Sequence, residues 1–236
     1  MPPLHALVNE NIILYGTVMS TGSLSSVLTR REARRRDRRD AILNVAAQYF
    51  LENGYAGTTM SGIAATLGGS KGTLWNHFPS KEELFASVLE QVTTAYRAHL
   101  SKILDACGDL ETTLRRVSLS LLEKVTSPQA IALHRLVSSE AGRFPEMGRI
   151  FYERAPRLSR ALIADFLSGA MERGHLRKAD PQAAARALTA LVMCRCHQEL
   201  LVGQIVTATP EMIAADADFA VDIFLRAYAP VKPKSD

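Results

Sequence analysis

Residues 58–85 have the sequence TTMSGIAATLGGSKGTLWNHFPSKEELF, and this stretch decides the fold. Its apolar residues recur at steps of three and four, which indicates helices rather than strands. Thr59 and Ser70 are each suited to cap a short helix, because their side-chain oxygens can accept from free backbone N–H groups. Gly68-Gly69 separates the two helices, and Pro79 ends the second. Two short helices joined by a glycine-containing turn predict a helix-turn-helix.

The two faces of this motif differ in the way that binding in a DNA groove requires. The inner face must be apolar, because the two helices have to be held at a fixed angle. The residues suited to this are Ile63, Leu67, Leu74 and Phe78. The outer face is small and polar, which lets a backbone approach DNA closely; it carries Ser70, Lys71, Gly72, Thr73, Asn76 and His77.

The rest of the chain also has helical periodicity. An apolar stripe that includes Ile42, Ala46 and Phe50 predicts a helix over 36–53, ended by Asn53-Gly54. No strand alternation of useful length is found. Further helices are expected over 80–106, 109–126, 128–142, 145–173 with a bend near Pro156, 181–204 and 210–228.

These elements predict an all-α protein with an N-terminal three-helix helix-turn-helix domain and a C-terminal helical bundle. We expect residues 1–29 to form a tail without order, with Met19 as an alternative start. Residues 30–90 are expected to form the helix-turn-helix domain with a basic arm, and residues 91–230 the bundle.

Composition narrows the function. Residues 30–39, RREARRRDRR, concentrate positive charge in a chain of net charge +4, so this run is either a solvated face or a contact for a polyanion. The three cysteines lack metal-site spacing, and we expect no metal. We expect neither a membrane span nor a signal peptide, and hence a cytoplasmic protein.

The SKGTLWNHFPSKEEL core (70–84) resembles the DNA-binding region of the TetR-like family of bacterial repressors. The match extends upstream through RRDAILNVAAQYFLENGYAGTT (38–59). Three residues depart from the family pattern: Gly69 replaces a small apolar residue, Trp75 a common tyrosine, and Asn76 a tyrosine or histidine. The resemblance implies that the exposed side of this region contacts operator DNA.

The residues expected at DNA follow from matching the motif position by position. A basic arm beside the motif would cross phosphates or enter the minor groove. Trp75 and His77 have an alternative place in the core. The expected DNA-binding residues are Arg34, Arg38, Thr59, Ser70, Lys71, Gly72, Thr73, Trp75, Asn76, His77 and Lys81, with Lys81 as a phosphate clamp.

The stretch RLVSSEAGRFPEMGRIFYERAP (135–156) resembles the C-terminal domain of the AefR-like subgroup. The resemblance to the TetR-like family implies a homodimer whose C-terminal bundle binds a small effector, and the apolar helices 181–204 and 210–228 suit an intersubunit four-helix bundle. An apolar stripe is also compatible with plain core. The residues expected to line an effector pocket are Tyr96, His99, Phe144, Met147, Phe151, Tyr152 and Met193.

An enzyme is the first competing class, and no nucleophile, phosphate-loop, metalloprotease or dinucleotide motif supports it. We therefore expect no catalytic residue and no cofactor. The second competitor is an all-α protein that binds nucleic acid or a membrane surface without a small-molecule switch. The favoured function is a homodimeric repressor that binds a palindromic operator on double-stranded DNA and is released by a small hydrophobic effector, with no membrane partner.

Overall fold

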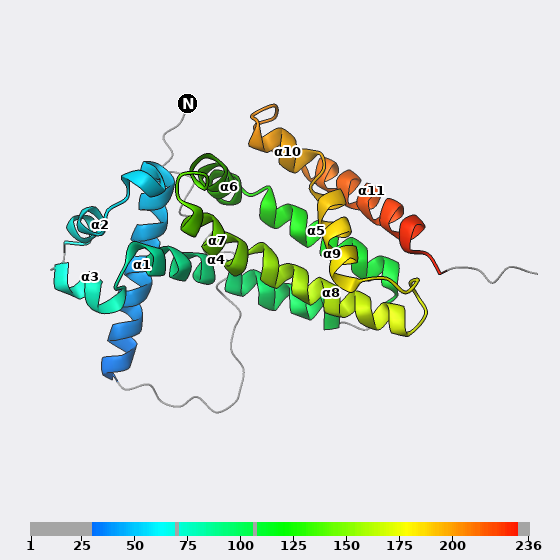
Figure 1. The fold of residues 1–236 in the computed structure, drawn as a ribbon, viewed down its shortest axis with the longest axis horizontal. Helices are drawn as coiled ribbons and strands as arrows, with labels where there is room; N and C mark the ends of the chain where they lie inside the picture. The colour runs from blue at the N-terminus through cyan, green and yellow to red at the C-terminus, as the bar shows by residue number, and fades with distance from the viewer. Residues whose placement is uncertain (1–29, 69–70, 106–107, 231–236) are drawn as a thin grey trace, which may run out of the picture. The chain divides into compact units, whose positions relative to one another are not determined.

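The computed structural model describes residues 30–68, 71–105 and 108–230, and within these ranges every regular element is a helix (Figure 1). The expected all-α class is confirmed. The expected tail, residues 1–29, lies outside the described residues. The helices are α1 (Arg30–Gly57), α2 (Met60–Thr66), α3 (Lys71–His77), α4 (Lys81–Asp105), α5 (Leu110–Val125), α6 (Pro128–Glu140), α7 (Pro145–Arg154), α8 (Pro156–Glu172), α9 (Pro181–Val192), α10 (Cys196–Leu201) and α11 (Pro210–Tyr228).

The chain divides into two compact units. The first unit contains the described residues up to Ala95 together with Ser139–Ile150, and the second contains Tyr96–Ser138 and the chain from Phe151 onward. The sequence predicted one C-terminal domain over 91–230. In the structure, the segment 139–150 of this range groups with the unit that contains the helix-turn-helix.

In the first unit α2 packs against both α1 and α3 (Figure 1, helices coloured blue to cyan). The expected inward face is buried at Ile63, Leu74 and Phe78. Removing each such side chain from water contributes about 1.5–3 kcal/mol, so this face fixes the angle between the two short helices. The other buried apolar side chains of this unit include Ile42, Leu43, Ala46, Phe50, Leu84, Phe85 and Leu89.

Local signals set the ends of these helices as expected. Thr59 caps α2, since its hydroxyl oxygen accepts from the Gly62 N–H at 3.0 Å. Gly54 interrupts α1 with φ 72° and ψ 173°, at the position where the sequence predicted the stop. At its other end α1 begins at Arg30, six residues earlier than expected, so the described part of the arginine run is helical.

The second unit is a bundle in which α8 packs on α9, and α11 packs on α5 and α9. The bend expected near Pro156 separates α7 from α8, at Ala155 with φ −116° and ψ −84°. The single helix expected over 181–204 is divided into α9 and α10 by Arg195, whose φ is −123° and ψ −87°. The core includes Leu100, Leu114, Val117, Leu122, Ile163, Leu167, Leu188, Val192, Val221 and Phe224.

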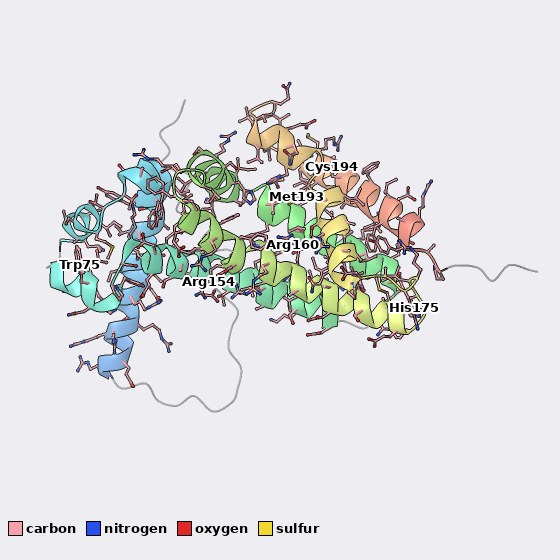
Figure 2. All side chains as sticks on the ribbon, viewed as in Figure 1. Trp75, Arg154, Arg160, His175, Met193 and Cys194 are labelled. Atoms are coloured by element: carbon pink, nitrogen blue, oxygen red, sulfur yellow. The ribbon has the colours of Figure 1, made fainter. Side chains whose placement is uncertain are left out.

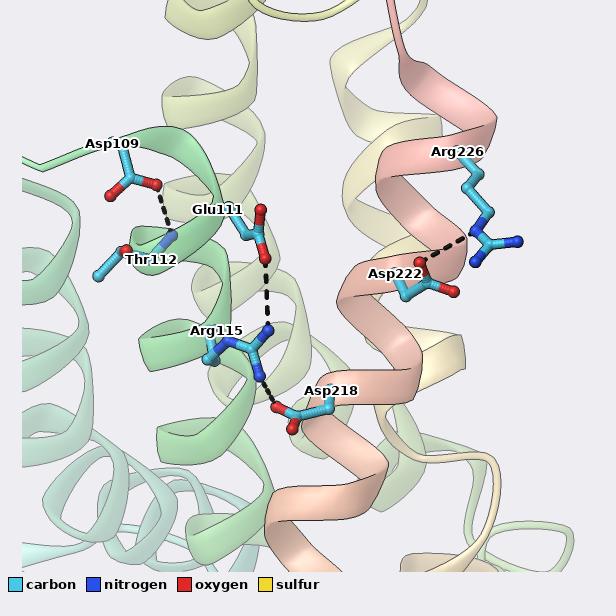
Figure 3. Close-up of polar contacts among 7 residues, drawn as sticks. All are labelled: Asp109, Glu111, Thr112, Arg115, Asp218, Asp222 and Arg226. Atoms are coloured by element: carbon cyan, nitrogen blue, oxygen red, sulfur yellow. Dashed lines mark hydrogen bonds and ion pairs between the residues drawn. The ribbon is translucent and has the colours of Figure 1, made fainter.

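Charged side chains tie α5 to α11 on the surface of this bundle (Figure 3). Arg115 of α5 bridges Glu111 of its own helix and Asp218 of α11, whereas Arg226 pairs with Asp222 at 3.0 Å within α11. Exposed pairs of this kind contribute at most about 1 kcal/mol each, so apolar burial carries the packing. Among the described helices, none is long and apolar enough to span a bilayer.

Candidate functional site

The outer face of α3 is polar and open to solvent. Gly72 and Asn76 are exposed, and Thr73 is half-buried. Trp75 is 39% exposed and projects from α3 (Figure 2), so the alternative of a buried indole anchor is wrong. The predicted cap at Ser70 and the side chain of Lys71 lie outside the described part of the chain; the backbone of Lys71 begins α3.

A positively charged hollow lies between the start of α1 and the end of α3. Its volume is about 480 Å³. From α1 it is lined by Arg34, Arg35 and Arg38 together with Glu32, and from α3 by Asn76 and His77. The structure thus brings four of the predicted DNA-binding residues, Arg34, Arg38, Asn76 and His77, to one place. Because Arg34–Arg39 are helical, these side chains project from a helix rather than from an extended arm.

The pKa of His77 reflects the charges that surround this hollow. Its pKa is lowered first by burial and then by the charges of Arg35, Arg39 and Arg38. The ring is half-buried and lies 6.2 Å from the ring of Phe78, so it both packs and lines the hollow. Burial disfavours charge of either sign, but the arginine charges that contribute to this shift attract an anion, and phosphate is the anion that DNA presents.

Lys81, predicted to be a phosphate clamp, has partners within the first unit. Its ammonium donates to the Tyr55 carbonyl at 2.8 Å and lies 4.2 Å from the centre of the Tyr55 ring. The charge is therefore turned into the first unit, where it holds the end of α1. This contact joins residues 26 apart in sequence, and a motif match cannot reveal it.

The residues expected to line an effector pocket do not fall in one unit. Phe144 and Met147 belong to the first unit, where Phe144 packs 5.4 Å from the ring of Tyr55 and Met147 is fully buried. Both side chains thus pack within the first unit, and their place in an effector pocket stays a prediction.

The remaining candidates lie in the second unit with different exposures. Tyr96, Phe151 and Met193 are half-buried, and Met193 follows the last turn of α9 (Figure 2). Tyr152 is 49% exposed beneath Arg160, and His99 is also exposed. Burial raises the pKa of Tyr96. These exposures favour Tyr96, Phe151 and Met193 over the other two as interior groups.

The sequence did not predict a pair of histidines in this unit, of which His197 is buried and His134 half-buried. His197 Nε2 lies 2.9 Å from His134 Nδ1, and the His134 ring contacts Phe151 edge to face at 5.5 Å. Burial lowers the pKa of both rings, that of His197 to about 4. The two histidines are 63 residues apart, so spacing gave no signal for the pair.

The fold and the hollow define a helix-turn-helix DNA-binding protein with a separate helical bundle. The model of bacterial regulatory proteins of the tetR family matches residues 42–88, and that of the AefR-like transcriptional repressor C-terminal domain matches residues 112–230. The chain belongs to the TetR family of transcriptional regulators, with an AefR-like C-terminal domain. Members of this family bind DNA and are not enzymes.

Individual relatives agree with this assignment. The flavonoid-responsive regulator FrrA is 32% identical, and the match covers 85% of this chain and 100% of FrrA with a TM-score of 0.70. A TetR-family regulator from Mesorhizobium loti is 27% identical over 86% of this chain and 100% of its own, also with a TM-score of 0.70. The regulator TcmR of Streptomyces glaucescens is 30% identical over 141 residues, which span 57% of this chain and 62% of TcmR.

Proposed function

We propose that this protein is a homodimeric repressor that binds a palindromic operator through α3 and releases it when a small, mostly apolar effector binds the second unit. The observation that carries the DNA-binding part is the hollow in which three arginines of α1 adjoin Asn76 and His77 of α3. We place its action in the cytoplasm, with no membrane partner.

In this proposal the two sides of the hollow have different tasks. Arg34 and Arg38 hold phosphates, which sets affinity and register but not sequence preference. Asn76 has the donor and acceptor pair that matches adenine in the major groove. Gly72 allows close approach, and Thr73 lies one residue further along the same exposed end of α3.

The other proposed DNA contacts extend this surface. Thr59 would add a phosphate contact to its role as the cap of α2, and Ser70 and Lys71 would act at the N-terminus of α3. The indole N–H of Trp75 can donate to a phosphate, and unlike a tyrosine hydroxyl it cannot accept.

Dimerisation is proposed through the last helices of the second unit. Phe219 on α11 is 51% exposed, and Val202 and Val206, which follow α10, are 78% and 96% exposed. Burying apolar side chains of this size against a second copy would be favourable. A two-fold axis would also present two copies of α3 to half-sites about 34 Å apart.

The effector class is inferred from a buried atom of the second unit. Within the described part of the chain, His197 Nδ1 is buried without a hydrogen-bond partner. A neutral ligand with a hydroxyl or carbonyl group would satisfy such an atom, whereas a charged ligand would need a counter-ion. FrrA, the relative named for its response to flavonoids, supports the same class.

Selection of bound sequences from a pool of randomised duplexes tests the operator. The expected result is a palindrome with half-sites about one helical turn apart; a bound pool without a consensus would contradict sequence-specific repression. Release of that operator by the flavonoid naringenin tests the ligand class. Naringenin that leaves the complex intact would contradict the proposed class without affecting the DNA-binding claim.

A further inference from the structure

Glu140, the last residue of α6, is bonded to a backbone turn 85 residues earlier in the chain. One carboxylate oxygen, Oε1, accepts from the Tyr55 N–H at 2.9 Å, and the other, Oε2, accepts from the Ala56 N–H at 2.7 Å. Bonds to an ionised acceptor are about twice as strong as neutral ones. A single side chain thus binds two successive amides of the first unit.

These amides need an external acceptor because of Gly54. Its φ of 72° interrupts α1, and the first N–H groups of a new helical turn have no carbonyl partner within that turn. Thr58 closes the same turn by donating its hydroxyl to the Gly54 carbonyl at 2.6 Å. The next residue, Thr59, is the cap of α2. Glu140 therefore fixes the turn from which the helix-turn-helix starts.

Tyr55 is held at three points in this turn. Glu140 binds its amide, Lys81 donates to its carbonyl, and its hydroxyl donates to Glu82 Oε1 at 3.1 Å. Phe144, four residues after Glu140, packs 5.4 Å from the Tyr55 ring. Both Glu140 and Phe144 belong to residues 139–150, which we call the clamp segment.

The clamp segment is part of the first unit, yet the chain on both sides of it belongs to the second. The preceding residues of α6, 128–138, and the following residues of α7, 151–154, are bundle residues. A change that moves α6 in the bundle therefore acts on the carboxylate that holds the α1–α2 turn. Such a link is reciprocal, since coupling between two binding sites is a single free energy.

We infer that Glu140 is a positioning residue for DNA recognition, through which the state of α6 and the placement of the helix-turn-helix depend on each other. The inference rests on the proposed DNA-binding function and deepens it. The alternative is a purely structural staple, whose loss would lower stability without changing DNA discrimination or communication with α6.

The test uses the full chain and the operator obtained by selection with the wild-type protein. Glu140→Gln keeps the shape but replaces one acceptor oxygen by an N–H₂ group that faces an N–H donor. Glu146→Gln is the matched control, because Glu146 lies in the same segment but is exposed and pairs with Arg149. Gly54→Ala disturbs the same contact without changing Glu140, because a Cβ at position 54 would lie 2.5 Å from Glu140 Oε1.

Two measurements distinguish a positioning role of Glu140 from a purely structural one. In fluorescence anisotropy, Glu140→Gln and Gly54→Ala should weaken operator binding about tenfold and change binding to a scrambled duplex less than about twofold. In hydrogen exchange, saturating operator should slow the amides of residues 128–138 in the wild type and in Glu146→Gln, but not in Glu140→Gln. If Glu140→Gln is too unstable to purify, Glu140→Asp, which is one methylene shorter, carries the same expectations.

The contrary results are distinct. Operator binding by Glu140→Gln equal to that of the wild type, or equal slowing of exchange in residues 128–138, would overturn the role of Glu140. Equal loss for operator and scrambled DNA would also overturn it, because a staple predicts a general loss. A wild-type protein that selects no operator would instead contradict the proposed function itself.

Discussion

Replacing Arg34 and Arg38 together by glutamine should make operator binding less sensitive to salt. The two residues are one helical turn apart on α1, and both line the hollow that contains Asn76 and His77. Each phosphate contact contributes roughly 0.9 to the slope of log affinity against log salt, so losing two lowers the slope by about 2. Between about 50 and 200 mM salt, this difference corresponds to about a tenfold change in affinity.

Fluorescence anisotropy with the selected operator measures this slope directly. The wild type should lose about tenfold more affinity over that salt range than the double variant. Arg36→Gln is the matched control: Arg36 is exposed on the same helix but does not line the hollow, so its slope should stay near that of the wild type. A double variant with the wild-type slope would refute the role of Arg34 and Arg38 as phosphate contacts. If Arg36→Gln lowered the slope by the same amount, the change would reflect net charge rather than contacts made by these two residues.

Three further predictions concern pH and assembly. The pKa of His77 is lowered in the free protein, first by burial and then by nearby arginines, and a bound phosphate would raise it. Operator affinity should therefore increase as pH falls from about 8 to about 6. A His77→Gln variant with the same pH dependence would contradict the assignment to His77. The pKa of His197 is lowered to about 4, below its value near 6.5 in the unfolded chain, so the folded state resists protonation. The free energy of unfolding in urea should therefore fall by about 2 kcal/mol between pH ~7 and pH ~5. A His197→Phe variant with the same fall would assign the pH dependence to other groups. Phe219→Glu should convert the dimer to the 25.8 kDa monomer in sedimentation velocity, because it places a charge in the proposed interface, and an unchanged dimer would place the interface elsewhere.

Local signals made the helix-turn-helix predictable from the sequence. The spacing of Ile63, Leu74 and Phe78 identified the buried face, and the Thr59 cap and the Gly54 break fixed helix ends within a few residues. Each of these features depends on residues within about two helical turns, so a short stretch of sequence is enough to predict it.

Contacts between distant parts of the chain were not predictable in the same way. The bonds from Glu140 to Tyr55 and between His134 and His197 join residues 85 and 63 positions apart. Phe144 was assigned to an effector pocket because an aromatic residue has the same pattern in a ligand site as in a core. Only the tertiary fold separates these two environments.

The central claim is that the outer face of α3 recognises an operator sequence. Its most direct test is the ratio of dissociation constants for the selected operator and a scrambled duplex, measured for the wild type and for Thr73→Ala combined with Asn76→Ala. Both side chains lie outside the buried core, so the variant should remain folded. We expect the ratio to fall by at least about tenfold while scrambled-duplex binding is retained. An unchanged ratio in a folded variant would contradict recognition by α3.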